Sequence, residues 1–423
     1  MSRQIQKCTM LSGLLAASAL APVVLAKDAA TVEELSRIIE QQQRQLEAQA
    51  RTLETLQQQV QSLQQPQPAA AAVDTAVAKD APGVVQSGGD RVKLSVSGQV
   101  NRGVLFTDDG KETEVFNVDN SNSSTRIRFI GELQANDDLT IGSNIEVQFE
   151  SNASSRVNQD DQRNVGPNNF TERKLELYAD SKRYGRLSLG QGDTASNSSS
   201  EVDLSGTGVI GYSSVSDMAG GILFRDADTG ELTGTNIGSV FSNLDGLSRD
   251  DRIRYDTPSF GGVNLSTSFI ADDRWDMALR FAGDFGSFKT AAAIAYADPN
   301  EDDFDSRISG SASLLHASGF NVTGAAGSDD YDDRDPDFWY IKLGYQTDSW
   351  ASWGLTALAV DYYSGDEIAL QGDESESYGA FVVQQLDDYG TELYFGLRNY
   401  SLDRRDENLD DVFAVLAGAR AKF

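Results

Sequence analysis

The end of the chain is its most constraining feature. Small or apolar side chains occupy every second position up to the last residue: Phe413, Val415, Ala417, Ala419, Ala421 and Phe423. The positions between them become basic toward the end, at Arg420 and Lys422. A period of two residues predicts a β-strand whose two faces meet different environments.

The same alternation runs from Arg91 onward and predicts about sixteen strands. They are expected at 92–106, 124–134, 139–150, 170–180, 184–192, 251–258, 262–271, 275–283, 287–297, 306–316, 319–327, 338–346, 352–363, 374–386, 391–401 and 410–423. Several are close to the ten or so residues that a tilted membrane-spanning strand needs.

The connections between these strands alternate in length. Turns such as 181–184 and 284–286 are short, whereas stretches such as 107–123 and 151–169 are long. Short turns at one end and longer loops at the other are typical of transmembrane barrels, and aromatic residues at the strand ends would form the interfacial girdle. The sequence therefore predicts an all-β fold, a 16-stranded antiparallel transmembrane β-barrel with an N-terminal coiled-coil helix. A soluble β-sandwich is the alternative, but it leaves the loop asymmetry unexplained.

Residues 1–26 have the pattern of a secretory signal peptide. Arg3 and Lys7 precede a short apolar run, and Val24-Leu25-Ala26 offers small residues for cleavage. Cys8 would leave with this leader, so the mature chain would contain no cysteine and no disulfide.

Residues 27–64 predict a coiled coil. The a positions of nearly five heptads are Val32, Ile39, Leu46, Leu53 and Val60, and no glycine or proline interrupts them. A lone amphipathic helix is the alternative. The core residues do not select a number of partner helices. Residues 65–90, rich in Ala, Pro, Gln and Gly, follow as a linker to a barrel over 91–423.

Charge and composition exclude several functions. The net charge of −30 argues against nucleic acid as a partner. His316 is the only histidine and has no evident nucleophile beside it, so the sequence predicts no enzyme, no catalytic residue and no cofactor. The acidic stretches 298–305 and 328–337 lack the spacing of a dedicated calcium loop, so no metal site is predicted.

Four stretches give residues 91–423 a resemblance to a known family. They are Leu94-Ser95-Val96-Ser97-Gly98-Gln99-Val100-Asn101, Tyr184-Gly185-Arg186-Leu187-Ser188-Leu189-Gly190, Ile253-Arg254-Tyr255-Asp256-Thr257-Pro258-Ser259-Phe260-Gly261-Gly262, and the strand that ends at Phe423. In this order they resemble the trimeric general porins of Gram-negative outer membranes.

The resemblance implies a homotrimer in the outer membrane, in contact with lipid and lipopolysaccharide. It implies a water-filled channel for passive diffusion of small hydrophilic solutes and ions, with Phe423 as the assembly signal. The outward faces near Ala292 and Gly310 would suit packing between protomers. The N-terminal module resembles the periplasmic extension of some phosphate-selective and dicarboxylate-type porins. An anion-selective channel, with the coiled coil as a tether to peptidoglycan, is therefore the alternative.

The longest connection, about 193–250, resembles by its position the porin loop that folds into the barrel. Its acidic candidates are Glu201, Asp203, Asp217, Asp226, Asp228 and Glu231. On the strands, the alternation of side chains predicts that a set of basic residues faces the lumen, opposite the acidic loop. They are Arg126, Arg128, Lys174, Arg252, Arg254 and Arg280. A basic side chain on the lipid face at mid-bilayer would cost about 2–4 kcal/mol, which supports this parity. The two sets would create a field across the pore, although the arginines would alternatively only pair with lumen carboxylates such as Glu132, Glu146 and Glu176.

Overall fold

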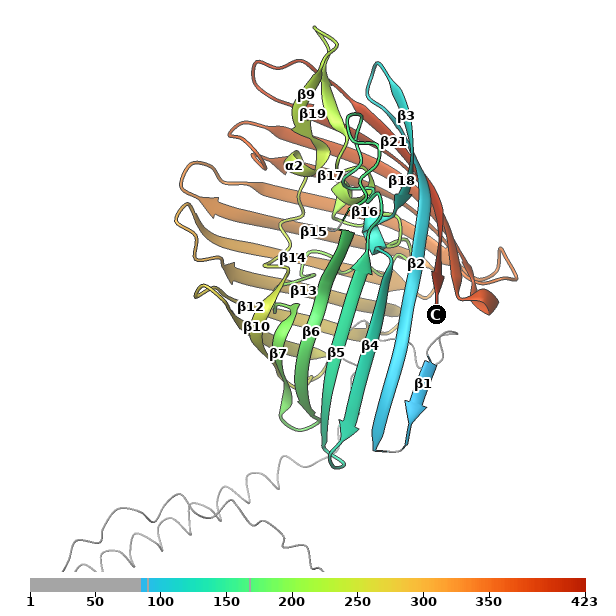
Figure 1. The fold of residues 1–423 in the computed structure, drawn as a ribbon, viewed down its shortest axis with the longest axis vertical. Helices are drawn as coiled ribbons and strands as arrows, with labels where there is room; N and C mark the ends of the chain where they lie inside the picture. The colour runs from blue at the N-terminus through green and yellow to red at the C-terminus, as the bar shows by residue number, and fades with distance from the viewer. Residues whose placement is uncertain (1–84, 90, 167–168) are drawn as a thin grey trace, which may run out of the picture. The chain divides into compact units, whose positions relative to one another are not determined.

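The computed structural model describes residues 85–89, 91–166 and 169–423 (Figure 1). The predicted leader, the heptad segment and most of the predicted linker lie outside the described residues. Within them, no helix is both long enough and apolar enough to cross a membrane.

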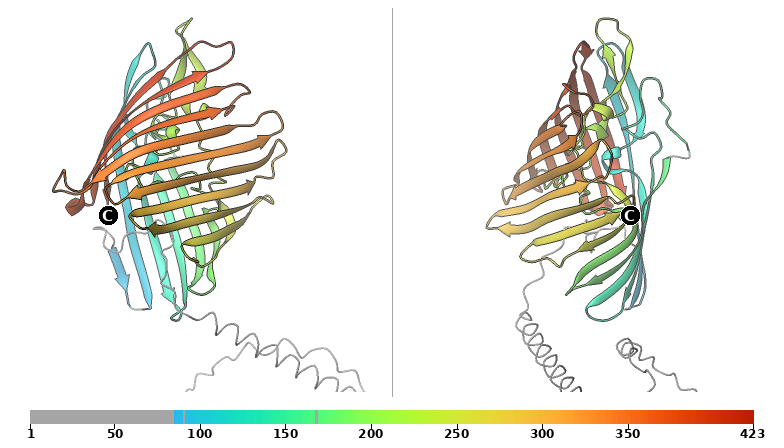
Figure 2. Two further views of the ribbon diagram at one scale, coloured as in Figure 1. Left: turned by 180° about the vertical axis from the view of Figure 1, so that it is seen from behind. Right: turned by 90° about the vertical axis from the view of Figure 1, so that its left-hand side faces the viewer.

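The described residues form a closed antiparallel barrel of sixteen strands, which confirms the predicted barrel (Figures 1 and 2). In chain order they are β2 (Val92–Asp108), β4 (Arg126–Gln134), β5 (Leu139–Phe149), β6 (Phe170–Ser181), β7 (Gly185–Asp193), β10 (Arg249–Asp256), β11 (Val263–Ile270), β12 (Trp275–Phe285), β13 (Phe288–Asp298), β14 (Phe304–His316), β15 (Phe320–Tyr331), β16 (Asp337–Thr347), β17 (Thr356–Asp366), β18 (Glu374–Leu386), β19 (Thr391–Asp403) and β21 (Val412–Lys422). Each pairs with the next, and β21 pairs with β2 from Gln99↔Lys422 to Asp108↔Phe413. The first and last strands therefore close the ring.

Two further strands lie along β2, which is long enough to have two sets of neighbours. β1 (Val85–Gly88) pairs with the first half of β2, at positions that β21 does not reach. β3 (Thr113–Asp119) pairs with the second half, beyond the positions that pair with β4. β3 occupies part of the connection 107–123 that the sequence predicts as a loop, and β1 lies within the predicted linker. Both extend the sheet without adding to the ring.

Strand β17 begins at Thr356, four residues later than the sequence predicts. Gly354 has φ of +143°, far from the φ of about −140° that an antiparallel strand needs. The alternation continues through this glycine, but the extended backbone does not.

The wall has an apolar outer face and a packed inner face. On β16, Trp339, Ile341 and Leu343 are exposed, whereas Phe338, Tyr340 and Lys342 between them are buried. Exposed aromatic side chains gather at strand ends and turns: Tyr184, Phe260, Phe285, Trp350 and Trp353. An outward apolar band with aromatic borders fits the hydrocarbon layer of a membrane.

The terminal residue completes the ring. The Phe423 N–H donates to Gly98 O at 2.9 Å, and the Gly98 N–H donates to Phe423 O at 2.6 Å. A Cβ at position 98 would lie 2.6 Å from the Phe423 ring and 2.7 Å from Arg126 O. Glycine is required here because the ring of the last residue packs on the backbone of the first spanning strand.

Candidate pore constriction

The connection between β7 and β10, residues 194–248, folds back along the inner wall of the barrel. Ser196 N–H and Oγ donate to the Asp276 carboxylate on β12 at 2.8 and 2.5 Å. Further along, Val202 N–H and Leu204 N–H donate to serine hydroxyls of β14. Strand β14 presents Ser309, Ser311 and Ser313 to the lumen, so short hydroxyls hold the loop backbone close to the wall.

Lys342 on β16 fixes the middle of this loop. Its side chain is fully buried, and its ammonium donates to Asp203 Oδ2 at 2.7 Å, Gly211 O at 2.5 Å and Thr207 Oγ1 at 3.1 Å. An ammonium has three protons to donate, and all three have acceptors here. The loop carboxylate Asp203 is therefore neutralised by the wall.

Beyond Lys342 the loop builds an apolar core inside the barrel. Ile210, Met218 and Ile222 are fully buried, as is Phe241, whose ring lies 5.4 Å from the Tyr363 ring and 5.3 Å from the Tyr400 ring. The two tyrosine hydroxyls donate to loop carbonyls at Ser242 and Val215, both at 2.7 Å. This packing fills the side of the lumen next to Tyr363 of β17 and Tyr400 of β19.

A cavity of about 730 Å³ lies between loop carboxylates and the opposite wall. The wall contributes Arg126, Arg128, Glu146, Arg173, Lys174, Asp193 and Arg249. The loop contributes Glu201, Asp203, Asp217 and Asp245, and Arg307 of β14 also lines the cavity. Of the predicted basic set, Arg126, Arg128 and Lys174 thus meet Glu201, Asp203 and Asp217 of the predicted acidic set across one cavity.

Part of the loop instead reaches the outer end of the barrel. β8 (Leu223–Asp226) and β9 (Leu232–Asn236) form a hairpin, followed by the short helix α2 (Ile237–Val240), and β20 (Leu409–Asp410) pairs with β8 (Figure 1). Asp226, Asp228 and Glu231 belong to this hairpin and do not line the cavity, in the part of the chain that the structure describes. The hairpin carries half of the predicted acidic set away from the constriction.

The wall side of the cavity carries an excess of positive charge. Glu146 accepts from Arg128 and from Arg173, and Arg126 lies 3.6 Å away. Asp193 pairs with Lys174 and with Arg249 Nε at 2.8 Å. Among the described residues that line this wall, five cations thus share two carboxylates.

Apart from Asp203, which pairs with Lys342, the loop side carries carboxyls held by neutral groups. Glu201 accepts from Ser198 Oγ and from Asn243 Nδ2, and Asp245 accepts from the N–H of Ser198 at 2.6 Å. Burial raises the pKa of Glu201 to about 8, and the Asp245 carboxylate adds to this effect. Burial also raises the pKa of Asp217 to about 6. The negative charge of the loop therefore depends on pH within the physiological range.

The other predicted basic residues lie on the lumen wall but do not line this cavity. Arg252 pairs with Glu176 at 2.5 Å, Arg254 with Asp256 at 2.7 Å, and Arg280 donates to Asn197 O at 2.8 Å. The contacts of Arg252 and Arg254 correspond to the alternative in which wall arginines pair with carboxylates, whereas Arg280 holds the loop backbone.

Arg173 is a cavity residue that strand parity misses. The register of β5 against β6 shifts between Glu146↔Lys174 and Val147↔Glu172. Arg173 is therefore an extra residue of β6 without a partner in the register, as in a β-bulge. As a result, the side chains of Arg173 and Lys174 both reach the lumen. The adjacent basic residues Arg173 and Lys174, after Glu172, were the available signal, but the bulge itself is not readable from the alternation.

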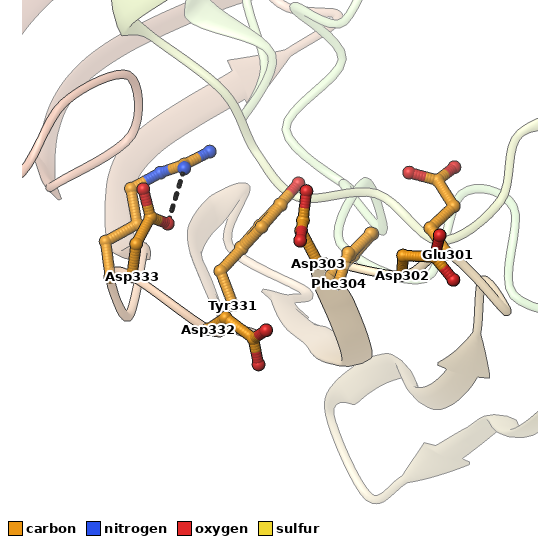
Figure 3. A pocket seen from close by; sticks show the side chains of 8 residues that line it. Glu301, Asp302, Asp303, Phe304, Tyr331, Asp332 and Asp333 are labelled. Atoms are coloured by element: carbon orange, nitrogen blue, oxygen red, sulfur yellow. Dashed lines mark hydrogen bonds and ion pairs between the residues drawn. The ribbon is translucent and has the colours of Figure 1, made fainter.

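The acidic outer loops form a second, separate hollow of about 530 Å³ (Figure 3). Figure 3 shows the carboxylates of Glu301, Asp303 and Asp332 spread around it, with Asp333 paired to the neighbouring Arg334. Among the described residues, no group of three acidic, histidine or cysteine side chains converges closely enough to hold a metal ion.

Most of the sequence matches one protein family. A family model described as Gram-negative porin matches residues 67–405. The chain belongs to this family. The porin is therefore an outer-membrane protein that forms a channel for passive diffusion of small hydrophilic solutes. A search of the curated proteins finds no match.

Solved structures share the fold of this porin at low sequence identity. An anion-selective porin from Comamonas acidovorans is 16% identical with a TM-score of 0.51, and the match covers 78% of this chain and 100% of that one. Outer-membrane expressed OmpT of Vibrio cholerae is 11% identical with a TM-score of 0.53, covering 80% and 100%. OmpF of Salmonella typhi, in complex with daunomycin, is 13% identical with a TM-score of 0.50, covering 80% and 100%.

Proposed function

We propose that the cavity between Arg126, Arg128, Arg173 and the loop carboxylates is the constriction that sorts solutes in this porin. The observation that carries this proposal is the opposition of charges. An excess of cations on one wall faces Glu201, Asp217 and Asp245 of the loop, for which the described residues form no ion pair. A passing solute with separated charges would be turned so that its negative end meets the arginines. Rings and rows of fixed charge set ion preference in pores by the same electrostatics.

The balance between the two sides sets the preferred ion. At neutral pH the wall retains its positive charge because arginine stays protonated, whereas Glu201 is partly neutral. This supports a modest preference for anions at neutral pH, which is weaker than the dedicated phosphate or dicarboxylate selectivity considered as the alternative.

Charge reversal on the wall tests this function. The double variant Arg126→Glu with Arg128→Glu should shift the reversal potential toward cation preference in planar bilayers under a salt gradient. Arg405→Glu is a matched control, because Arg405 is exposed and does not line the cavity. An equal reversal potential in the double variant and the wild type would refute the role of these two arginines.

We also propose that the porin is a homotrimer whose heptad segment, 31–64, lies in the periplasm and contacts peptidoglycan. The heptads support partner helices, and a solved structure of Vibrio cholerae OmpT is described as a trimer form. Deleting 27–84 would spare β1 and the barrel. We expect unchanged single-channel conductance with reduced envelope integrity, and unchanged integrity would argue against the tether.

The chain is proposed to have no enzymatic activity. His316 Nδ1 accepts from the N–H of Ser318, two residues away, at 3.2 Å and lies 2.7 Å from its hydroxyl. This is a local turn contact at the end of β14. Among the residues that the structure describes, no third group orients the imidazole as a catalytic base requires.

A further inference from the structure

Strands β3 and β4 lie end to end along the same edge of β2. β3 pairs with β2 down to Arg102↔Asp119, and β4 continues from Gln99↔Arg126. Two residues of β2 lie between these ladders, whereas six residues, 120–125, connect β3 to β4. The surplus residues cannot continue the ladder, so they leave the sheet, as the extra residues of a β-bulge do.

This connection, which we call the lumen turn, reaches the constriction. Its middle forms the short 3₁₀ helix η1 (Ser121–Ser123), and all three residues of η1 line the cavity between the basic wall and the constriction loop. Asn120 and Ser124 on either side of η1 are buried, whereas the three residues of η1 are half-buried. The lumen turn is therefore anchored at both ends and presents its tip to the cavity.

Polar side chains hold the lumen turn in place. Gln99 Nε2 of β2 donates to Ser123 O at 3.0 Å, and Asn101 Nδ2 donates to the same carbonyl at 2.9 Å. Asp119 Oδ1, at the end of β3, accepts from the Thr125 N–H at 2.9 Å and closes the turn across its base. Side chains thus take over from the backbone ladder that the turn interrupts.

The lumen turn contacts both charged sides of the constriction. Arg126, which follows the turn, donates from Nε to Ser124 O at 3.0 Å, so the turn orients one of the wall guanidiniums. On the other side, the fully buried Asn120 donates from Nδ2 to Val209 O of the constriction loop at 2.8 Å. The turn therefore bridges the basic wall and the loop along one side of the cavity.

The tip of the lumen turn is polar and uncharged. Residues 120–125 contain only asparagine, serine and threonine. At the tip, the N–H and Nδ2 of Asn122 both donate to Asn120 Oδ1, at 3.0 and 2.8 Å, which fixes the side chain. An amide has a second N–H and a carbonyl oxygen, so Asn122 can still form hydrogen bonds with a passing solute.

We propose that Asn122 determines, together with the charged groups, which solutes pass the constriction. It forms a third, uncharged side of the passage, and it bonds the hydroxyl or amide groups of a solute whose charged ends meet the arginines and the loop carboxyls. This inference rests on the constriction proposed above and adds a residue that sets its width and its preference for solutes that carry such groups.

Modification of a single cysteine tests whether Asn122 lines the passage. Asn122→Cys is combined with Cys8→Ser, because Cys8 is the only cysteine in the sequence. The probe is a methanethiosulfonate reagent that transfers a trimethylammonium ethyl group, applied during single-channel recording. We expect modification to lower the conductance roughly twofold, because a bulky charged group then stands in a narrow aqueous pore. Asn300→Cys is the matched control and should not respond, since Asn300 is exposed in the β13–β14 connection and does not line the cavity.

Charge at the same position separates lining from bracing. Asn122→Asp should shift the reversal potential in the direction of cation preference, and Asn122→Lys should shift it in the direction of anion preference. If the turn only braced the loop, both variants would disturb the passage in the same way, whatever the sign of the charge. Shifts in the same direction, or no shift in either variant, overturn the proposal.

Arg128→Cys distinguishes this proposal from the constriction itself. If modification of Arg128→Cys changes the conductance while that of Asn122→Cys does not, the constriction stands and Asn122 is not part of it. If neither responds, the cavity is not the constriction and both proposals fail. Ser121→Cys replaces Asn122→Cys if the latter does not fold, because Ser121 also lines the cavity and a thiol is close in size to its hydroxyl.

Discussion

Replacing Lys342 by methionine should release the constriction loop from the wall. Methionine has a similar length but no charge, so Asp203 would remain buried without a cation, and Gly211 O and Thr207 Oγ1 would lose a donor. Removing one partner of a buried ion pair costs about 3–5 kcal/mol. At 1.4 kcal/mol for each factor of ten, the equilibrium between the docked and the undocked loop would shift by about two to four orders of magnitude toward the undocked loop.

Urea unfolding in lipid vesicles measures the loss of stability, and single-channel recording measures the release of the loop from the wall. The Lys342→Met channel should show a larger or noisier current, because an undocked loop no longer narrows the lumen at a fixed position. Lys289→Met is the matched control, since Lys289 is exposed on β13 and such a change costs within about 0.5 kcal/mol.

The double variant Lys342→Met with Asp203→Leu tests whether the ion pair itself holds the loop. Replacing a whole buried ion pair by apolar residues is often neutral, so the second substitution should recover most of the lost stability. If the double variant is less stable than Lys342→Met alone, or if Lys342→Met behaves like Lys289→Met, the ion pair does not hold the loop.

The constriction and the closure of the barrel lead to three more predictions. Raising the pH from about 5 to about 9 should increase the cation preference in reversal-potential measurements. The reason is that Asp217, with a pKa of about 6, and Glu201, with a pKa of about 8, lose protons and become negative as the pH rises. Glu201→Gln should remove the part of this change near pH 8, and an unaltered pH profile in that variant would exclude Glu201 as its source. Arg173→Ser should shift the reversal potential in the direction of cation preference, as Arg128→Ser does, whereas Glu172→Ser on the opposite face of β6 should leave it unchanged. The reverse pattern would mean that the bulge does not direct Arg173 into the pore. Gly98→Val and Phe423→Ala should each lower the amount of folded, heat-modifiable barrel on gels. The Cβ of Gly98→Val would meet the Phe423 ring and the Arg126 carbonyl, and Phe423→Ala removes that ring. Normal folding of Gly98→Val would show that the terminal ring does not need this space.

The strands were predictable because their signal is local. On β16 the alternation of Trp339, Ile341 and Leu343 with inward residues is visible in the sequence, and it directly reports two media. The start of β17 was wrong by four residues, because the period of two continues through Gly354 while the backbone conformation does not.

The path of the constriction loop was not predictable in detail, because it depends on contacts between distant segments. The acidic residues of 193–250 read alike in the sequence, yet Glu201 lines the cavity while Asp228 lies in the β8–β9 hairpin. Lys342 was not singled out at all, although it holds Asp203 across 139 positions of the chain. Parity likewise missed Arg173, because a bulge inserts one residue and reverses the face of the residues after it.

The pairing of β2 with β21 has a consequence for how the protein is made. Every fragment that lacks the last strand has two sheet edges whose N–H and C=O groups have no partners, and hydrocarbon supplies none. Such a fragment cannot insert stably into the lipid, because its unpaired edge groups would be exposed to hydrocarbon. Insertion therefore has to wait until synthesis is complete, and a message truncated by even one strand yields material for proteases rather than a leaky membrane.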